Sequence, residues 1–125
     1  MGKAAKGSTS ERIEMDGFAG EYAEVEGYTI GFERYDADSD PADLFRGLPD
    51  DRCQCPHWGV VLSGELIYKE ANGSTISIGP GEAYHVAPGH LPEFRVGTEV
   101  VEFSPTAELA KTIEVVTRNL EAANA

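Results

Sequence analysis

The chain has 125 residues, a mass of 13.5 kDa and a net charge of −12, from 10 basic and 22 acidic side chains. This length suits a single domain with one hydrophobic core, and a composition of 41% hydrophobic and 26% charged residues is that of an ordinary globular protein. The acidic excess repels phosphate backbones and anionic lipid headgroups. Nucleic acid and membrane surfaces are therefore excluded as expected partners.

The start of the chain carries no recognisable targeting signal. Residues 1–10 contain two lysines but no apolar segment, so we expect a flexible tail there and not a secretory signal. No apolar run approaches the roughly 18 residues that a membrane span requires. Two cysteines, Cys53 and Cys55, are too few for a disulfide framework. Together these features predict a protein of the reducing cytoplasm.

Residues 11–103 favour short strands separated by turns. Apolar and polar side chains alternate over residues 28–33, the pattern of a strand with one buried face. A polar loop follows at residues 36–43, and residues 44–48 form an apolar cluster that suits one helical turn. Asn72-Gly73 is the strongest hairpin signal in the chain. Short strands at this spacing predict a sandwich or closed barrel, with further strands at residues 60–62, 66–68, 75–78, 83–86, 94–96 and 100–103.

Residues 104–125 differ from the rest and predict one amphipathic helix. Ser104 is a candidate N-cap, and Pro105 suits the first helical position. Apolar residues then recur at spacings of four, three and four, which places them on one face. We expect this stripe to pack on its own barrel, the alternative being an interface with another protein. It consists of Leu109, Ile113, Val116 and Leu120.

Residues 51–58 hold the densest group of reactive side chains, with two thiols, an imidazole and a carboxylate. In an extended chain, residues two apart share a face, so Cys53, Cys55 and His57 would point the same way. Thiolate and imidazole are ligands for zinc, copper or iron and not for magnesium or calcium. Two other interpretations stay open: cysteines that are only small buried residues, and a strained disulfide between Cys53 and Cys55.

Two stretches of the chain resemble the cupin superfamily. The first is His57-Trp58-Gly59-Val60-Val61-Leu62-Ser63-Gly64-Glu65, and the second is Gly79-Pro80-Gly81-Glu82-Ala83-Tyr84-His85-Val86-Ala87-Pro88-Gly89-His90. The resemblance implies an all-β protein, an antiparallel jelly-roll β-barrel over residues 11–103 with a C-terminal helix over residues 104–125. It also implies a possible homodimer, and one metal ion in the barrel mouth, held in the family by three His and one Glu.

This chain has three of the glycines of the family motifs, whereas the opening Gly of the first motif falls on Phe45 and the metal-ligand positions hold other residues. The family's Glu position falls on His57, and its two His positions fall on Asp51 and Cys53. Its last His position falls on Pro92, two residues after His90. The usual set of three His and one Glu is therefore absent. The glycines that fit are Gly64, Gly81 and Gly89.

Two classes of function fit this pattern. In the first, a divalent transition metal is bound in the barrel mouth, where the protein binds or acts on a small molecule; zinc is expected first because mixed Cys and His sets suit it. If the protein is an enzyme, the metal polarises a substrate oxygen or activates water, and His57 or His90 transfers protons. The predicted metal ligands are Cys53, Cys55, His57 and His90.

In the second class, a non-catalytic module binds a small ligand without a catalytic metal, or senses metal or oxidant through its two thiols. Both classes need a pocket inside the barrel. The aromatic side chains predicted to line that pocket, unless they only form the core, are Trp58, Tyr84 and Phe94.

Overall fold

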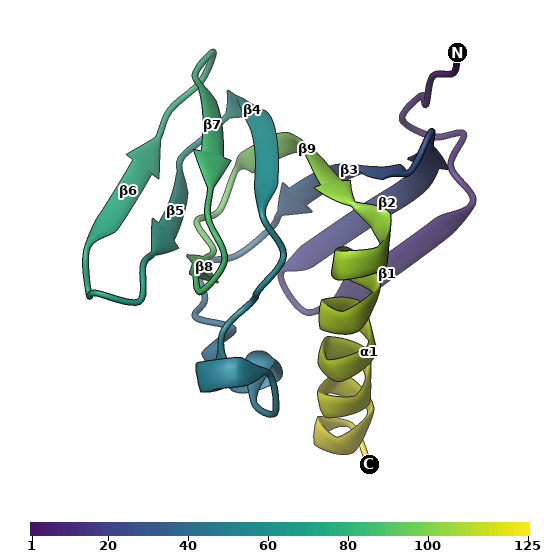
Figure 1. Cartoon of the computed structure of the whole chain (residues 1–125). Helices are drawn as coiled ribbons and strands as arrows, with labels where there is room; N and C mark the ends of the chain where they lie inside the picture. The colour runs from purple at the N-terminus through teal and green to yellow at the C-terminus, as the bar shows by residue number, and fades with distance from the viewer.

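The structure of the protein is a computed structural model that describes residues 1–125 (Figure 1). It contains nine strands, two short 3₁₀ helices and one α-helix. The strands are β1 (Glu11–Met15), β2 (Phe18–Val25), β3 (Tyr28–Tyr35), β4 (His57–Ser63), β5 (Leu66–Lys69), β6 (Thr75–Ile78), β7 (Ala83–Val86), β8 (Leu91–Glu93) and β9 (Thr98–Pro105). The helices are η1 (Ala42–Phe45), η2 (Pro49–Asp51) and α1 (Thr106–Ala123).

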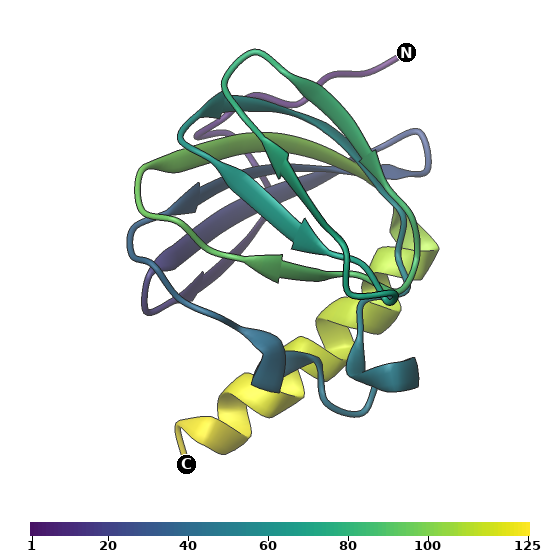
Figure 2. The same cartoon turned by 90° about the vertical axis from the view of Figure 1, so that its left-hand side faces the viewer.

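The strands form two antiparallel sheets that face each other across the barrel interior (Figure 2). One sheet has six strands in the order β1-β2-β3-β9-β4-β7, and the other has three in the order β6-β5-β8. The predicted all-β jelly roll with a C-terminal helix is thus confirmed. One strand differs in position: it was expected at residues 94–96 and lies at Leu91–Glu93, where it pairs with β5.

Glycines on the inner face of the large sheet make room for tyrosine rings. Tyr22 on β2 pairs with Gly31 on β3, and a Cβ at Gly31 would lie 2.8 Å from a ring carbon of Tyr22. On β4, a Cβ at Gly59 would lie 2.6 Å from the hydroxyl of Tyr84. These strands therefore carry large polar aromatic residues into the barrel, and the residues opposite them have no side chains.

Buried apolar residues form two clusters. The first fills the barrel and includes Phe18, Tyr35 and Phe94. The second lies between the loop before β4 and the C-terminal helix, and consists of Phe45, Leu48, Cys53, Cys55 and Val116, with Leu44, Leu91, Leu109 and Val115 packed against it. Two members of the predicted apolar stripe, Leu109 and Val116, thus pack within their own chain, against the loop before β4 and the start of β8.

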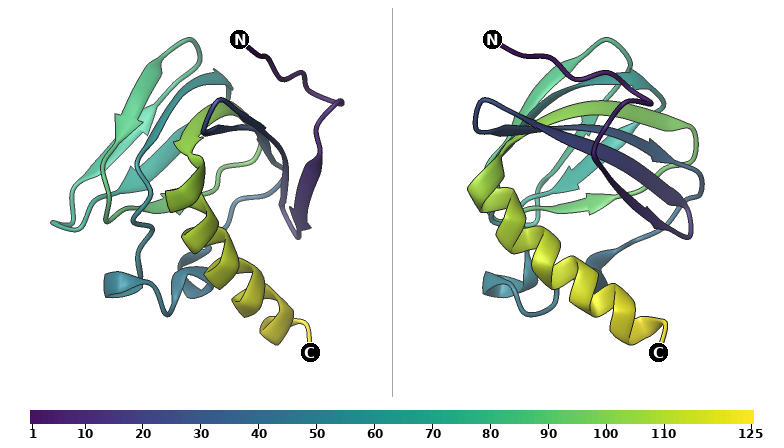
Figure 3. Two further views of the ribbon diagram at one scale, coloured as in Figure 1. Left: turned by 45° about the vertical axis from the view of Figure 1, so that its right-hand side comes forward. Right: turned by 90° about the vertical axis from the view of Figure 1, so that its right-hand side faces the viewer.

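Helix α1 follows β9 without a loop and lies across one end of the barrel (Figure 3). It begins at Thr106, one residue after the first helical position predicted at Pro105, because β9 continues through Pro105 and pairs with β3. Ser104 does not cap the helix, since its hydroxyl faces inward and lies 2.7 Å from Nδ1 of His57. Neither this helix nor the shorter ones combine the length and apolar character needed to cross a bilayer.

The outer face of the large sheet exposes several large apolar side chains. Trp58 on β4 pairs with Phe103 on β9, and its ring lies edge-on to that of Tyr28 on β3, 6.4 Å away between centroids. Leu62, also on β4, is 56% exposed. The predicted homodimer would be formed by sheet packing, and this face is the surface available for it.

Candidate metal centre

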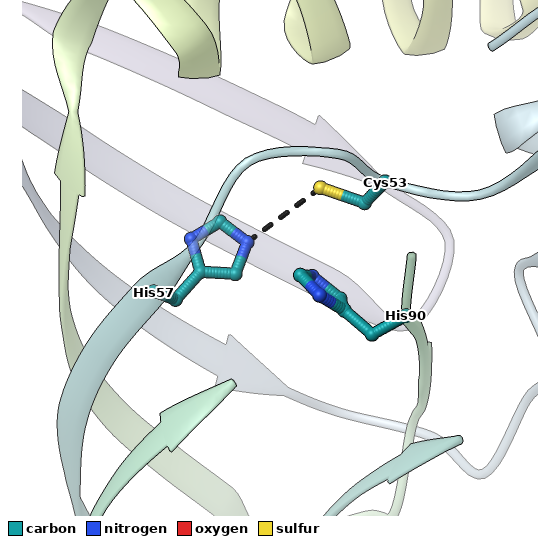
Figure 4. A group of neighbouring side chains, drawn as sticks. All are labelled: Cys53, His57 and His90. Carbon is teal, nitrogen blue, oxygen red and sulfur yellow. Dashed lines mark hydrogen bonds between the residues drawn. The ribbon is translucent and has the colours of Figure 1, made fainter. Parts of the chain in front are cut away.

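Three side chains meet inside the barrel mouth: Cys53, His57 and His90 (Figure 4). Each offers one ligand atom, and these atoms all lie within 4.8 Å of one another. None of the three residues is more than 5% exposed. The cluster therefore lies inside the protein and is shielded from solvent.

The backbone holds these residues in place from two sides. Cys53 lies in the loop after η2, and its N–H donates to the carbonyl oxygen of His90 at 3.0 Å. The N–H of His90 donates in return to the carbonyl oxygen of Cys53 at 3.2 Å. His57 is the first residue of β4, where strand alternation turns its ring inward. Residues far apart in the sequence are thus fixed against each other.

The imidazole of His57 is oriented by two oxygens on β9. Its Nδ1 lies 2.7 Å from Oγ of Ser104 and 3.4 Å from Oε1 of Glu102. A proton on Nδ1 is shared with these oxygens, which leaves the lone pair on Nε2. Nε2 faces Sγ of Cys53 at 3.7 Å, the contact drawn as a dashed line in Figure 4.

The imidazole of His90 is fixed in the same tautomer by a backbone carbonyl. Its Nδ1 lies 2.6 Å from the oxygen of Ala87, and a carbonyl oxygen can only accept, so Nδ1 carries the proton. The lone pair is then on Nε2, which is buried and makes no hydrogen bond. It is the one buried side-chain nitrogen or oxygen of the protein without a partner. Such a group is costly to bury unless something binds it.

Burial keeps both imidazoles neutral and the thiol protonated in the absence of a ligand. It lowers the pKa of His57 to about 3 and the pKa of His90 to about 4. It also raises the pKa of the Cys53 thiol. A thiolate–imidazolium pair is therefore disfavoured, and with it a role for Cys53 as an activated nucleophile. A metal ion would find two free imidazole lone pairs and would displace the thiol proton.

The donor set fits a soft divalent metal. Two Nε2 lone pairs and one sulfur converge, and each Nδ1–H is held by an oxygen, as in metal-binding histidines generally. One thiolate and two imidazoles suit zinc, copper or iron. The group could therefore bind a metal ion.

The fourth predicted ligand is not part of this group. Cys55 is buried, but its Sγ donates to the carbonyl oxygen of Pro56 at 3.3 Å and lies outside the cluster. Residues 54–56 are not in a strand, so the alternation that would place Cys55 beside Cys53 and His57 does not apply.

The three aromatic residues predicted to line the pocket take three different positions. Phe94 lines the cavity beside the metal centre. Tyr84 is buried inside the barrel but is not among the cavity residues; its hydroxyl donates to Oε2 of Glu102 at 2.5 Å. Trp58 lies on the outer face, 42% exposed, because it follows the inward-facing His57 in the strand and so points the opposite way.

A cavity of about 100 Å³ adjoins the cluster, and all three candidate ligands line it. The barrel supplies one wall, and residues of η1 and α1 cover the mouth, among them Thr112, whose Oγ1 lies 3.4 Å from Sγ of Cys53. Rings line it at Phe18, Tyr22, Tyr35, Tyr68 and Phe94.

Two cavity residues were missed by the sequence analysis, Glu33 and Glu102. Glu102 is 7% exposed and accepts hydrogen bonds from the hydroxyls of Tyr68 at 2.7 Å and of Tyr84. Glu33 accepts one from the hydroxyl of Tyr22 at 2.7 Å. Burial raises the pKa of both carboxyl groups. The signal in the sequence was their place in the alternating pattern of β3 and β9, which puts both side chains on the inward face of these strands.

No protein-family model and no curated protein matches the sequence. The fold does match solved structures: an RmlC-like cupin protein from Desulfovibrio desulfuricans has a TM-score of 0.56 and 16% sequence identity, over 84% of this chain and 97% of that one. This chain has the cupin fold. An RmlC-like cupin from Shewanella frigidimarina has a TM-score of 0.54 and 14% identity, over 82% of this chain and 88% of that one.

Two further solved structures share this cupin fold. KdgF from Halomonas sp. has a TM-score of 0.51 and 11% identity, over 77% of this chain and 86% of that one. Ectoine synthase from P. lautus has a TM-score of 0.54 and 13% identity, over 75% of this chain and 67% of that one. At these identities the likeness establishes the fold, and the function has to be argued from the site itself.

Proposed function

We propose that this cupin-fold protein binds one divalent transition-metal ion, zinc first, through Cys53, His57 and His90. We further propose that the ion serves a small molecule held in the adjoining cavity. The observation that carries the proposal is Nε2 of His90, a buried lone pair without a partner that points at two other ligand atoms. A metal ion satisfies all three atoms at once.

The number of ligands favours a site that works on a small molecule over a purely structural one. Structural zinc sites are closed by four protein ligands, whereas sites with three leave one position for water or substrate. Here Cys55 turns away to Pro56, and the three ligands border a cavity. Zinc in such a position would supply a Lewis acid toward an oxygen of the bound molecule.

The residues around the ligands have separate tasks in this proposal. Glu102 and Ser104 hold the His57 ring in the tautomer that frees Nε2. His57 and His90 use Nε2 for the metal and Nδ1 for orientation, so the proton-transfer role predicted for them passes to other groups. Glu33, half-buried and facing the cavity, is an acidic group that does not contact the three ligands and remains available to the bound molecule. The alternative is a binding module that uses the same cavity without chemistry.

The test is the metal content of untagged protein, measured by elemental analysis after growth with added zinc. We expect about one ion per chain in wild type, and loss of most of it in Cys53→Ala, His57→Ala and His90→Ala. Cys55→Ala is the matched control, since it removes a buried thiol two residues from Cys53 and should keep the metal. Equal metal in all variants, or none in wild type, would refute the proposal, with circular dichroism checking that each variant is folded.

Cobalt substitution adds a spectroscopic readout of the same site. Co²⁺ bound by a thiolate gives a sulfur-to-metal charge-transfer absorption in the near ultraviolet. We expect this band in wild type and in Cys55→Ala and its absence in Cys53→Ala. A band that depended on Cys55 instead would move the site to the other thiol.

A further inference from the structure

The cavity is mostly apolar, and its only side chains that carry a full charge when ionised near neutral pH are acidic. Its lining of 23 residues contains two glutamates, Glu33 and Glu102, and neither Lys nor Arg. No lysine or arginine of the protein forms an ion pair with either carboxyl group. Buried acids without a basic partner are rare, because an unpaired charge is costly to remove from water.

The carboxyl group of Glu33 is open toward a ligand. One of its oxygens accepts the hydroxyl of Tyr22 at 2.7 Å, and the other receives no hydrogen bond from the protein. Glu102, by contrast, is engaged by two tyrosine hydroxyls and by His57. Glu102 and the thiolate of Cys53 would together balance a divalent ion at the metal centre. Glu33 is then the acidic group left for a bound molecule.

The cavity walls carry aromatic rings suited to a cation. The rings of Phe18, Tyr35 and Phe94 pack together with centroid distances of 4.5 to 5.7 Å, and all three line the cavity. Aromatic faces attract cations through their quadrupoles, and desolvated ammonium groups gain most from them. The tyrosine side chains of Tyr22 and Tyr68 add further rings to the same lining.

The unpartnered imidazole of the candidate metal centre borders the same cavity. His90 lines it, is only 2% exposed, and has an Nε2 without any partner in the protein. An acidic group with a free oxygen, an aromatic wall and an unpartnered imidazole nitrogen thus border one space. A packing defect would not be expected to gather all three.

We infer that the small molecule bound in this cavity carries a positively charged ammonium group, which lies between the Glu33 carboxylate and the aromatic wall, beside the metal centre. The inference rests on the proposed function for the place of the ligand, but not for its charge. Burial and the nearby charge of Glu102 raise the pKa of Glu33, and a bound cation would favour its ionised form and lower that pKa.

The test compares three probes of similar size and different charge: tetramethylammonium, tert-butanol and trimethylacetate. Tetramethylammonium has no nitrogen lone pair and so cannot ligate the metal. Affinities are measured by calorimetry on zinc-loaded protein at constant ionic strength and about pH 9, above the pKa of about 8 to which burial raises Glu33. We expect tetramethylammonium to bind at least about tenfold more tightly than either of the other probes.

Variants then assign the preference to one side chain. Glu33→Gln keeps the shape and removes the charge, so tetramethylammonium affinity should fall by about tenfold while tert-butanol affinity and metal content stay unchanged. Glu24→Gln makes the same charge change at an exposed position of β2 and serves as the matched control. Glu24→Gln should leave all three affinities at the wild-type value.

The outcomes separate this inference from the proposed function. Metal-loaded protein that binds none of the probes, or binds the neutral or anionic probe as tightly as tetramethylammonium, overturns the inference alone. An affinity for tetramethylammonium that survives in Glu33→Gln also overturns it. If wild type takes up no metal but still prefers tetramethylammonium through Glu33, the metal proposal fails and the inference stands. The wild-type probe series decides the charge preference even if the Glu33 variant does not fold.

Discussion

Removing the imidazole of His90 should make the metal-free protein less sensitive to acid. The pKa of His90 is lowered by burial from an ordinary value of 6.5 to about 4. Between these two values the unfolded chain binds a proton at this position and the folded protein does not. Stability therefore falls as the pH falls from about 6.5 toward 4, and no further loss from this group occurs below that range.

The size of this effect follows from the two pKa values. Each pH unit inside the window costs about 1.4 kcal/mol, so His90 alone removes about 2 kcal/mol between pH 7 and pH 5. This is a large share of the roughly 5–15 kcal/mol by which domains are stable. His57 adds a similar loss, while the two buried carboxyl groups act in the opposite direction, since their raised pKa values favour the folded state on acidification.

The assay is urea unfolding at pH 7, 6 and 5 in the presence of a chelator, for wild type and His90→Gln. Glutamine has no titrating group, so the difference between the two profiles isolates His90 from the other buried groups. We expect wild type to lose about 2 kcal/mol more than His90→Gln from pH 7 to pH 5. Parallel profiles would refute the reasoning, because they would mean that His90 takes up its proton in the folded protein.

Two further predictions concern packing and assembly. Gly59→Ala should lower the free energy of unfolding by about 1–3 kcal/mol, because its Cβ would lie 2.6 Å from a carbonyl oxygen of β9 that cannot move away. Gly79→Ala is the control, since its Cβ would meet only the end of a flexible side chain at 3.3 Å, and it should change the free energy of unfolding much less. Thermal unfolding of both variants measures the difference. We also propose a homodimer through the exposed face of the large sheet, so light scattering should give about twice 13.5 kDa, with Leu62→Glu shifting the protein toward monomer. A monomeric wild type at micromolar concentration would contradict this.

Much of the fold could be predicted because strands and turns leave local signals. Alternation over residues 28–33 and the Asn72-Gly73 turn correspond to β3 and to the turn between β5 and β6. The bounds of β1 and most of β2 were not predicted, since Glu11–Met15 has only two apolar residues, Ile13 and Met15, and this alternation is too short to mark a strand by itself. The exact start of α1 depended on a tertiary contact, the use of Ser104 by His57, which no local signal reveals.

The residues of the candidate metal centre could be predicted where sequence spacing brings them together, but not where the path of a loop decides which side chains meet. Cys53 and His57 were predicted as ligands because they lie in one short segment. His90 was predicted because it lies in the turn that the cupin resemblance places at the barrel mouth. Cys55 lies outside this cluster because the loop between Cys53 and β4 does not have the extended conformation of a strand. Glu33 and Glu102 were missed because a carboxylate in an alternating strand is ordinarily assigned to the solvent face. Only the pairing of β3 with β9 shows that both side chains enter the same cavity.

The helix across the barrel mouth has a consequence for how metal enters. All three candidate ligands are at most 5% exposed, and Thr112 of α1 lies against the sulfur of Cys53. A proposed ion arriving from solvent would therefore reach these ligands through a local opening of the mouth, and the rate of that opening would limit the rate of uptake without changing the affinity. Titrations of the folded apoprotein with metal would then need long equilibration before an affinity is read.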